Sequence, residues 1–147
     1  MTTNRLDALV KEWSQDANID ETELGKHAID LAKLHSKYLS LLVQNNIDRS
    51  RLEVSYNNLR QLKSDYYSGL LDQDQLKEFG WEPFALKLTK SGVEHKVATD
   101  KELIDILLKK VIYDEYSEAC KSILNEIKSM HFSIRAAIDW QRFINGG

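Results

Sequence analysis

The sequence predicts a mainly α-helical fold built around a long central helix. Proline occurs once among the 147 residues, at Pro83, and residues 1–82 contain glycine only at Gly25, Gly69 and Gly80. Stretches with so few helix breakers favour long helices. Apolar residues also recur at steps of three and four, the period of an amphipathic helix. The length is typical of one domain, and we expect residues 1–147 to form it.

Residues 5–15 predict the first helix, because Leu6, Leu9, Val10 and Trp13 share one face. Asp20 follows, with Glu23 three positions later. An acidic cap with Glu at this spacing resembles a capping box, so we expect the next helix to begin here.

A heptad seam runs through residues 21–68 and ends at Gly69. Nine of its thirteen positions are apolar or aromatic. The positions are 24, 27, 31, 34, 38, 41, 45, 48, 52, 55, 59, 62 and 66. One helix over this segment would be on the order of 70 Å long. Gly69 is suited to a left-handed cap at its end.

Polar residues interrupt the seam at Asn45, Asp48 and Ser55, and residues 44–50 are poor in helix formers. Two interpretations remain. The helix is continuous and its polar layers fix the register, or it turns at 44–48 into a helical hairpin. The absence of glycine and proline at this point favours the continuous helix.

Residues 70–100 predict a connector with an acidic first half and a small β-hairpin. Phe84, Leu86 and Leu88 alternate with other residues before the segment Lys-Ser-Gly, and Val93 and Val97 follow it. Alternation with a period of two is typical of strands. An isolated hairpin is marginal, so we expect this one to pack on helices or on another subunit.

Two helices are predicted in the last part of the chain. The segment from Thr99 to Glu102 has the pattern of a capping box and opens a helix that reaches about Met130. A final helix fits residues 133–144, capped by Ser133 and stopped by Gly146. It carries too much apolar surface to face water. Four of its residues are candidates for contacts between subunits, with packing on the preceding helix as the alternative: Ile134, Ile138, Trp140 and Phe143.

The sequence therefore divides into an N-terminal helical part (1–69), the connector (70–100) and a C-terminal helical assembly part (101–147). No nucleotide-binding glycine loop, no HExxH and no glycine-flanked nucleophile is present. We therefore expect no enzyme activity, no cofactor and no metal site. The single cysteine, Cys120, is expected to be a buried thiol, and a chain without disulfides fits the cytoplasm. No apolar stretch approaches the ~20 residues that span a bilayer.

The most distinctive stretch is RQLKSDYYSG, residues 60–69. On its residues Asp65 to Gly69 the chain resembles the phage recombination mediator proteins of the UvsY type. The segment 127–132, IKSMHF, and the closing pattern from Ile134 to Gly146 follow the family order, so the resemblance covers most of the chain. Lys63 matches a basic position of the family motif. Gln61 stands where the family has a second basic residue, and Arg60 lies next to it.

The resemblance implies a non-enzymatic protein that forms ring-like homo-oligomers of six or seven subunits. It implies binding to single-stranded DNA and contacts with a RecA-like recombinase and a single-strand DNA-binding protein. Such a mediator helps load the recombinase onto covered strands, in recombination-dependent replication and repair. It would work in the cytoplasm, that of the host cell if the protein is phage-encoded. The alternative is a coiled-coil structural or adaptor protein with no DNA role.

The residues themselves point to a local DNA-binding surface. The formal net charge is −3, yet residues 49–63 hold four basic side chains against Glu53 alone. Helical spacing puts Arg60, Lys63 and Tyr67 on one stripe, and we expect this stripe to face DNA. Leu59, Leu62 and Tyr66 would then continue the buried seam. The full set of predicted DNA contacts is Arg60, Lys63, Tyr67, Arg49 and Arg51. In the alternative, both tyrosines are core residues.

Overall fold

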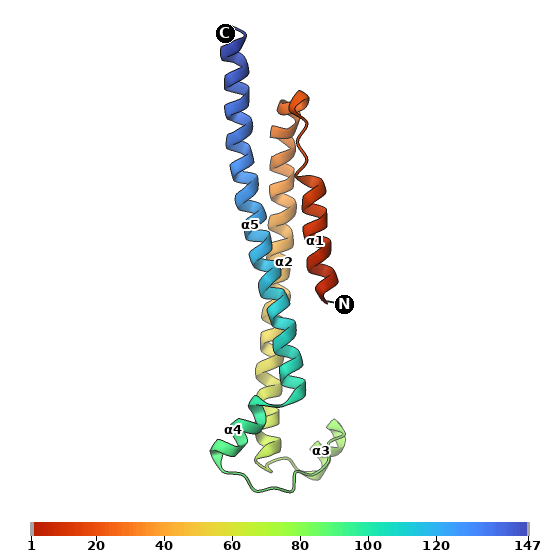
Figure 1. Ribbon diagram of the computed structural model, residues 1–147. Helices are drawn as coiled ribbons and strands as arrows, with labels where there is room; N and C mark the ends of the chain where they lie inside the picture. Colours follow the sequence, from red (N-terminus) through yellow and green to blue (C-terminus); the bar gives the residue numbers. More distant parts are fainter. Residues whose placement is uncertain (1, 147) are drawn as a thin grey trace. The chain divides into compact units, whose positions relative to one another are not determined.

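The computed structural model describes residues 2–146, and within this range every regular element is a helix (Figure 1). The predicted mainly α fold class is confirmed. The elements are α1 (Thr2–Asp16), the 3-10 turn η1 (Glu21–Glu23), α2 (Leu24–Tyr67), α3 (Gln73–Phe79), α4 (Lys90–Ala98) and α5 (Lys101–Ile144).

These helices form two compact units. The bundle unit consists of Met1–Asp48 and Ile112–Gly147, and the connector unit of Arg49–Val111. Both units contain a part of α2 and a part of α5.

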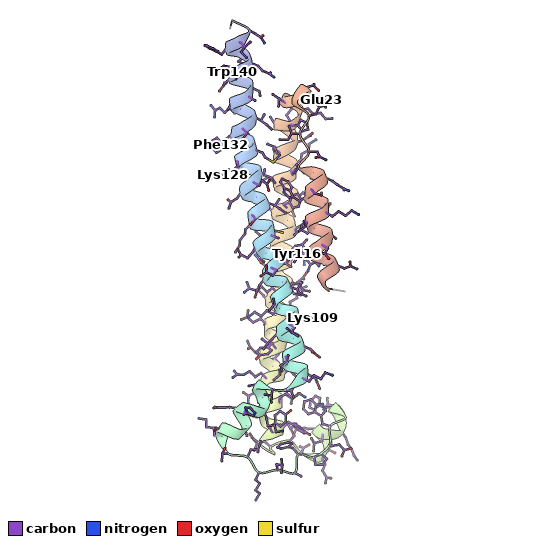
Figure 2. The ribbon with its side chains drawn as sticks, in the orientation of Figure 1. Glu23, Lys109, Tyr116, Lys128, Phe132 and Trp140 are labelled. Atoms are coloured by element: carbon purple, nitrogen blue, oxygen red, sulfur yellow. The ribbon has the colours of Figure 1, made fainter. Side chains whose placement is uncertain are left out.

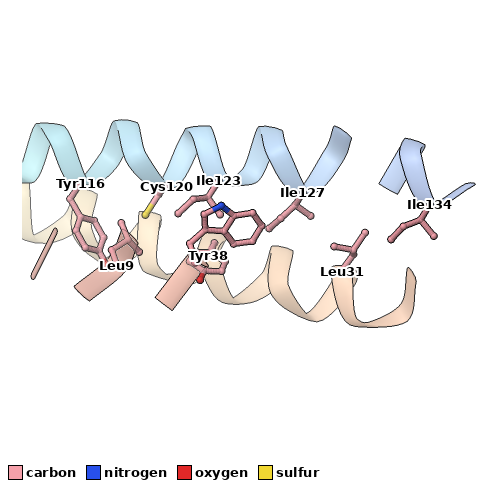
Figure 3. Packing of buried hydrophobic residues seen from close by; sticks show 9 residues of the cluster. Leu9, Leu31, Tyr38, Tyr116, Cys120, Ile123, Ile127 and Ile134 are labelled. Carbon is pink, nitrogen blue, oxygen red and sulfur yellow. The ribbon is translucent and has the colours of Figure 1, made fainter. Parts of the chain in front are cut away.

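The bundle unit is a three-helix arrangement in which α1 and α5 run in one direction and α2 in the other (Figure 1). Its core lies between the three helices, and Figure 3 shows this packing. The buried apolar members are Leu9, Trp13, Leu31, Tyr38, Tyr116, Cys120, Ile123, Ile127 and Ile134. Burying an aliphatic or aromatic side chain of this size contributes about 1.5–3 kcal/mol, so this core is the main source of the unit's stability.

Aromatic and polar contacts lock α1 onto this core. The rings of Trp13 and Tyr38 meet edge to face with centroids 5.4 Å apart. The indole Nε1 of Trp13 donates to Glu126 Oε2 at 3.0 Å. Val10, predicted on the buried face of α1, is exposed. The helix buries Leu9 and Trp13 and half-buries Leu6, and Val10 lies beside that face.

The central helix α2 is continuous, as the absence of glycine and proline suggested. Asn45 is fully buried, and its Nδ2 donates to the backbone oxygen of Tyr113 and to Ser117 Oγ, at 2.9 and 3.0 Å. A buried amide with these partners is compatible with a helix and favours one register between α2 and α5. The interpretation as a helical hairpin that turns at 44–48 is therefore wrong.

The cap at Asp20 differs from the predicted box. Its carboxylate accepts from the backbone N–H of Thr22, as an N-cap does. Its own backbone N–H, however, donates to His27 Nε2 at 2.7 Å and not to Glu23. His27 thus accepts the hydrogen bond that the predicted capping box assigned to the carboxylate of Glu23.

The predicted β-hairpin at 84–98 is wrong. Residues 90–98 form α4, whose N-cap Thr89 accepts from the backbone N–H of Gly92 at 3.1 Å. Val93 and Val97 are four residues apart, so they lie on one helical face, and both are buried. The alternation at 84–88 was too short to specify a strand, and those residues form no regular element.

The C-terminal region is one helix, so the predicted break near residues 130–133 is also wrong. The hydroxyl of Ser133 donates to the backbone oxygen of Ser129 within α5 instead of capping a new helix. The start of α5 is shifted by one residue from the prediction. Asp100 Oδ1 accepts from the backbone N–H of Leu103, while Thr99 terminates α4. Leu107 and Val111, predicted on the apolar face, are exposed.

Candidate nucleic-acid interface

The segment DYYSG ends α2 inside the connector unit. Gly69 has a φ of 72°, the left-handed conformation predicted for it. Its N–H donates to the backbone oxygen of Tyr66, and the N–H of Leu70 donates to that of Asp65. This pair of bonds is a Schellman motif, which satisfies carbonyls that the helix end would leave unpaired. The first role of the motif is therefore to end the central helix at a defined residue.

The two tyrosines of the motif anchor this helix end to the connector. Their rings and those of Phe79, Trp81 and Phe84 form one aromatic cluster. Centroids of neighbouring rings lie 5.1–5.7 Å apart, mostly tilted or edge to face. The hydroxyl of Tyr66 donates to the backbone oxygen of Glu82 at 2.6 Å. The acidic connector thus folds back against the end of α2.

Lys63 lies at the centre of a charged network. Only 8% of its side chain is exposed, and its Nζ lies 3.1 Å from Asp100 Oδ2 and 3.2 Å from Glu102 Oε1. The same Nζ lies 4.4 Å from the ring centroid of Trp81, within the range of a cation–π contact. Tyr67 completes the network, because its hydroxyl donates to Asp100 Oδ2 at 2.6 Å. Separate segments of the connector unit therefore meet at one ammonium group.

The network stabilises the ionised form of Asp100. Burial alone would raise the pKa of this carboxyl. Hydrogen bonds from Tyr67, from the backbone of Leu103 and from Lys63 outweigh that effect, so the pKa of Asp100 is lowered. Burial, together with the hydrogen bond to Asp100, raises the pKa of Tyr67. Both groups therefore keep their usual charge states at neutral pH.

The burial of Lys63 follows from a shift in the helical seam. The predicted seam used positions 55 and 62 of α2, but Ser55 is exposed, while Tyr56 is half-buried and packs against the core of the connector unit. Position 63 is likewise buried, one residue after the predicted Leu62, which is half-buried. A helix buries residues at both i+3 and i+4, so the repeat alone could not choose between neighbours. In the folded chain position 63 lies on the buried face of α2, and the basic side chain of Lys63 is therefore buried.

The predicted DNA-binding residues consequently lie in different surroundings. Arg60 is exposed, and it lines a groove of about 340 Å³ between α2 and α4. Other residues of this groove are Asn57, Gln61, Ser64, Glu94 and Val97. Lys63 is buried and Tyr67 half-buried in the network. Arg51 is exposed and Arg49 half-buried. The expected stripe of Arg60, Lys63 and Tyr67 is therefore not one exposed surface in this structure.

Sequence reasoning missed three members of the network: Trp81, Asp100 and Glu102. Of these three, only Glu102 has a predicted role, as the last residue of the capping box that begins at Thr99. One signal was present, because Lys63 follows Tyr56 and Leu59 at helical spacing and so falls on an apolar face. A lysine at such a position needs a buried carboxylate, and Asp100 is such a residue.

The four candidates for subunit contacts also differ in how far they are exposed to solvent. Ile134 is buried in the core of the bundle unit, and Ile138 packs against that core. Trp140 and Phe143 are 61% and 75% exposed, and their rings stack with centroids 5.7 Å apart. Phe132 and Ile144 are exposed on the same helix, and Figure 2 shows Phe132 and Trp140 along α5. Ile134 is therefore packed inside the bundle unit, whereas the exposed aromatic pair lies near the end of α5.

Membrane spans and metal sites are absent from the described part of the chain. No helix within residues 2–146 is long and apolar enough to cross a membrane. Over the same described residues, no group of three or more His, Cys, Asp or Glu side chains is placed to hold a metal ion.

Comparison with known families gives a match over nearly the whole chain. The family model described as "Recombination, repair and ssDNA binding protein UvsY" matches residues 12–147. The chain belongs to the UvsY family. The resemblance seen at DYYSG is thereby confirmed. No curated protein sequence matches the chain significantly.

Solved structures share the helical fold of this family member. Three crystal structures of the bacteriophage T4 recombination mediator protein UvsY are similar to it. Lattice type II has a TM-score of 0.81 and 26% identity, and the match covers 96% of this chain and 98% of that one. Lattice type I has a TM-score of 0.79 and 25% identity, with coverage of 92% and 98%. Lattice type IV, at 24% identity, has a TM-score of 0.80 over 94% and 98% and shows the fold alone.

Proposed function

We propose that this UvsY family member is a recombination mediator that binds single-stranded DNA. It would help load a RecA-like recombinase onto strands covered by a single-strand DNA-binding protein, and would do so without catalysis. The family match over residues 12–147 carries the proposal. The similar structures at 25–26% identity are those of a protein named as a recombination mediator, which supports the same role.

The distribution of charge supports the connector unit as the DNA-binding part. It holds 11 basic and 10 acidic side chains, whereas the bundle unit holds 9 basic and 13 acidic ones. Polyanionic DNA is repelled less by the connector unit. Arg60 is the predicted contact best placed to act first, because it is exposed and lines a polar groove. Arg49, Arg51, Lys63 and Tyr67 stay predicted contacts.

Self-assembly would turn a weak site into a strong one. A single guanidinium contributes little, but a ring of six or seven subunits presents the same site many times, and the contacts add through avidity. We propose that Trp140 and Phe143 join subunits, with Ile138 beside them. The exposed ring surface of both aromatic residues supports this assignment.

The first test is fluorescence anisotropy with a labelled oligo-dT strand over a range of salt concentrations. Arg60→Ala should weaken binding and reduce the salt slope by about 0.7 for each phosphate that is no longer neutralised. Lys109→Ala is the matched control, since Lys109 is an exposed cation of the same unit and lies on α5 (Figure 2). It should leave the slope unchanged. Equal effects of both variants would reject the assignment of Arg60.

The loading step needs a separate measurement. A strand is first covered with the single-strand DNA-binding protein, and the DNA-dependent ATP hydrolysis of the recombinase is then followed. The wild-type chain should shorten the lag before hydrolysis, and Arg60→Ala should shorten it less. An assembled wild-type protein that neither binds the strand nor changes the lag would favour the coiled-coil adaptor.

A further inference from the structure

Lys63 has two carboxylate partners that differ sharply in their exposure to solvent. The side chain of Asp100 is 5% exposed and that of Glu102 is 57% exposed, although both lie close to the same Nζ. Asp100 also accepts from Tyr67 and from the backbone N–H of Leu103. Glu102 has no further partner that holds it in place among the described residues. One partner of Lys63 is thus built into the fold and the other is at the surface.

The difference in exposure predicts a difference in strength. An ion pair with one partner in water contributes little to stability, since solvent screens it. Removing a partner from a buried pair costs several times more, because an uncompensated charge remains inside. Glu102 can therefore leave Lys63 at low cost, while Asp100 cannot.

The departure of Glu102 would leave a site suited to an anion. An ammonium group has three N–H donors, and Asp100 engages only part of this capacity. The ring of Trp81 covers another side of the group at 4.4 Å. The direction that Glu102 occupies is the one open to solvent, because Glu102 is the only exposed partner described for this ammonium. A phosphate oxygen is negatively charged and accepts hydrogen bonds from an ammonium group, as the carboxylate of Glu102 does.

We propose that Lys63 is a binding site for a backbone phosphate of single-stranded DNA and that Glu102 occupies this site in the free chain. DNA binding exchanges the carboxylate of Glu102 for the phosphate, while Asp100 and Trp81 keep the ammonium in position. This inference rests on the proposed function. It also reconciles the buried position of Lys63 with its predicted DNA contact.

Electrostatics favour the exchange once Glu102 has moved. Lys63, Asp100 and Glu102 together carry a net charge of −1, which repels a phosphate. With Glu102 turned into solvent, the remaining pair is neutral and the phosphate meets a donor without a net opposing charge. Glu102 acts in this way as an internal competitor that lowers the affinity of the free chain for DNA.

The test compares Glu102→Gln with Asp105→Asn in the oligo-dT assay. Both variants remove one negative charge from an exposed position near the start of α5. Glu102→Gln should tighten binding roughly two- to fivefold, the change that corresponds to an exposed ion pair. Asp105→Asn should give a clearly smaller gain, because Asp105 is not a partner of Lys63. Equal gains in the two variants would overturn the proposal, since general charge would then explain them.

A double-mutant cycle tests whether the tighter DNA binding of Glu102→Gln depends on Lys63. In a Lys63→Gln background the change Glu102→Gln should no longer tighten binding, and a retained gain would reject the exchange. Thermal unfolding of each variant shows whether Lys63→Gln folds. If it does not, the comparison of Glu102→Gln with Asp105→Asn still decides. A wild-type chain that binds no DNA would refute the proposed function, which is a different outcome from equal gains.

Discussion

The bundle unit and the connector unit are each stabilised internally, and the main interactions differ between the two. Nine buried apolar residues from three helices form the core of the bundle unit. The connector unit has three, Val93, Val97 and Leu103, and adds the Lys63 network and the aromatic cluster. Apolar packing depends on volume, whereas a buried ion pair depends on charge and on every partner being present. The connector unit therefore depends more on a buried ion pair than the bundle unit, whose charged network at Lys37 is more exposed.

The largest effect is expected for Asp100→Ala. This change removes the buried partner of Lys63, the acceptor for Tyr67 and the cap of α5 at once. Breaking a buried pair from one side costs about 3–5 kcal/mol. Urea unfolding measures the loss, and hydrogen exchange should place it in residues 49–111. Asp105→Ala, at an exposed position of the same helix, is the control and should change stability by less than about 0.5 kcal/mol.

A somewhat smaller loss is expected for Ile123→Ala in the bundle unit. Ile123 is buried in the core (Figure 3), and such a truncation costs about 2–5 kcal/mol through reduced burial and the cavity that remains. Because no charge is involved, this cost should be the same in low and high salt. A cost that varied strongly with salt would contradict the contrast between the two units.

Acid should weaken the connector unit through Asp100. The pKa of Asp100 is lower in the folded chain than in the unfolded one, so the folded state binds fewer protons there. The stabilising contribution is therefore complete above the pKa of Asp100 in the unfolded chain, and it is lost as the pH falls through the lower pKa of the folded chain. Acid titrations of the wild type and Asp100→Asn, followed by tryptophan fluorescence, measure this. The variant should lack that part of the acid transition, and identical curves would exclude Asp100 as its source.

The adjacent tyrosines offer the finest comparison. Tyr67→Phe removes a hydrogen bond to a carboxylate, which is worth about 1.5–3 kcal/mol. Tyr66→Phe removes one to the backbone oxygen of Glu82, worth about 0.5–1.5 kcal/mol. Both variants keep the aromatic ring and its stacking. Thermal unfolding should therefore rank Tyr67→Phe as the more destabilised, and the reverse order would mean that Asp100 does not depend on this hydroxyl.

Several features of this protein could be predicted from local sequence because their causes are local. The near absence of proline and glycine before residue 83 predicted the continuous helix α2. Gly69 and Gly146 predicted where α2 and α5 end, and both adopt a left-handed conformation. Helix propensity and glycine caps depend on residues within one or two turns. The DYYSG segment was sufficient to indicate the UvsY family.

Other features depend on neighbours that are distant in sequence. Residues 90–98 form a helix in which Val93 and Val97 are buried together with Leu103. The helix α5 continues through Ser133 because its apolar face packs on α2. The periodic pattern likewise could not predict that Lys63 is more deeply buried than Leu62. A helical repeat defines a face about two residues wide, and the partner that covers the face selects within it. For Lys63 that partner is Asp100, 37 positions away, and only the tertiary structure brings the two charges together.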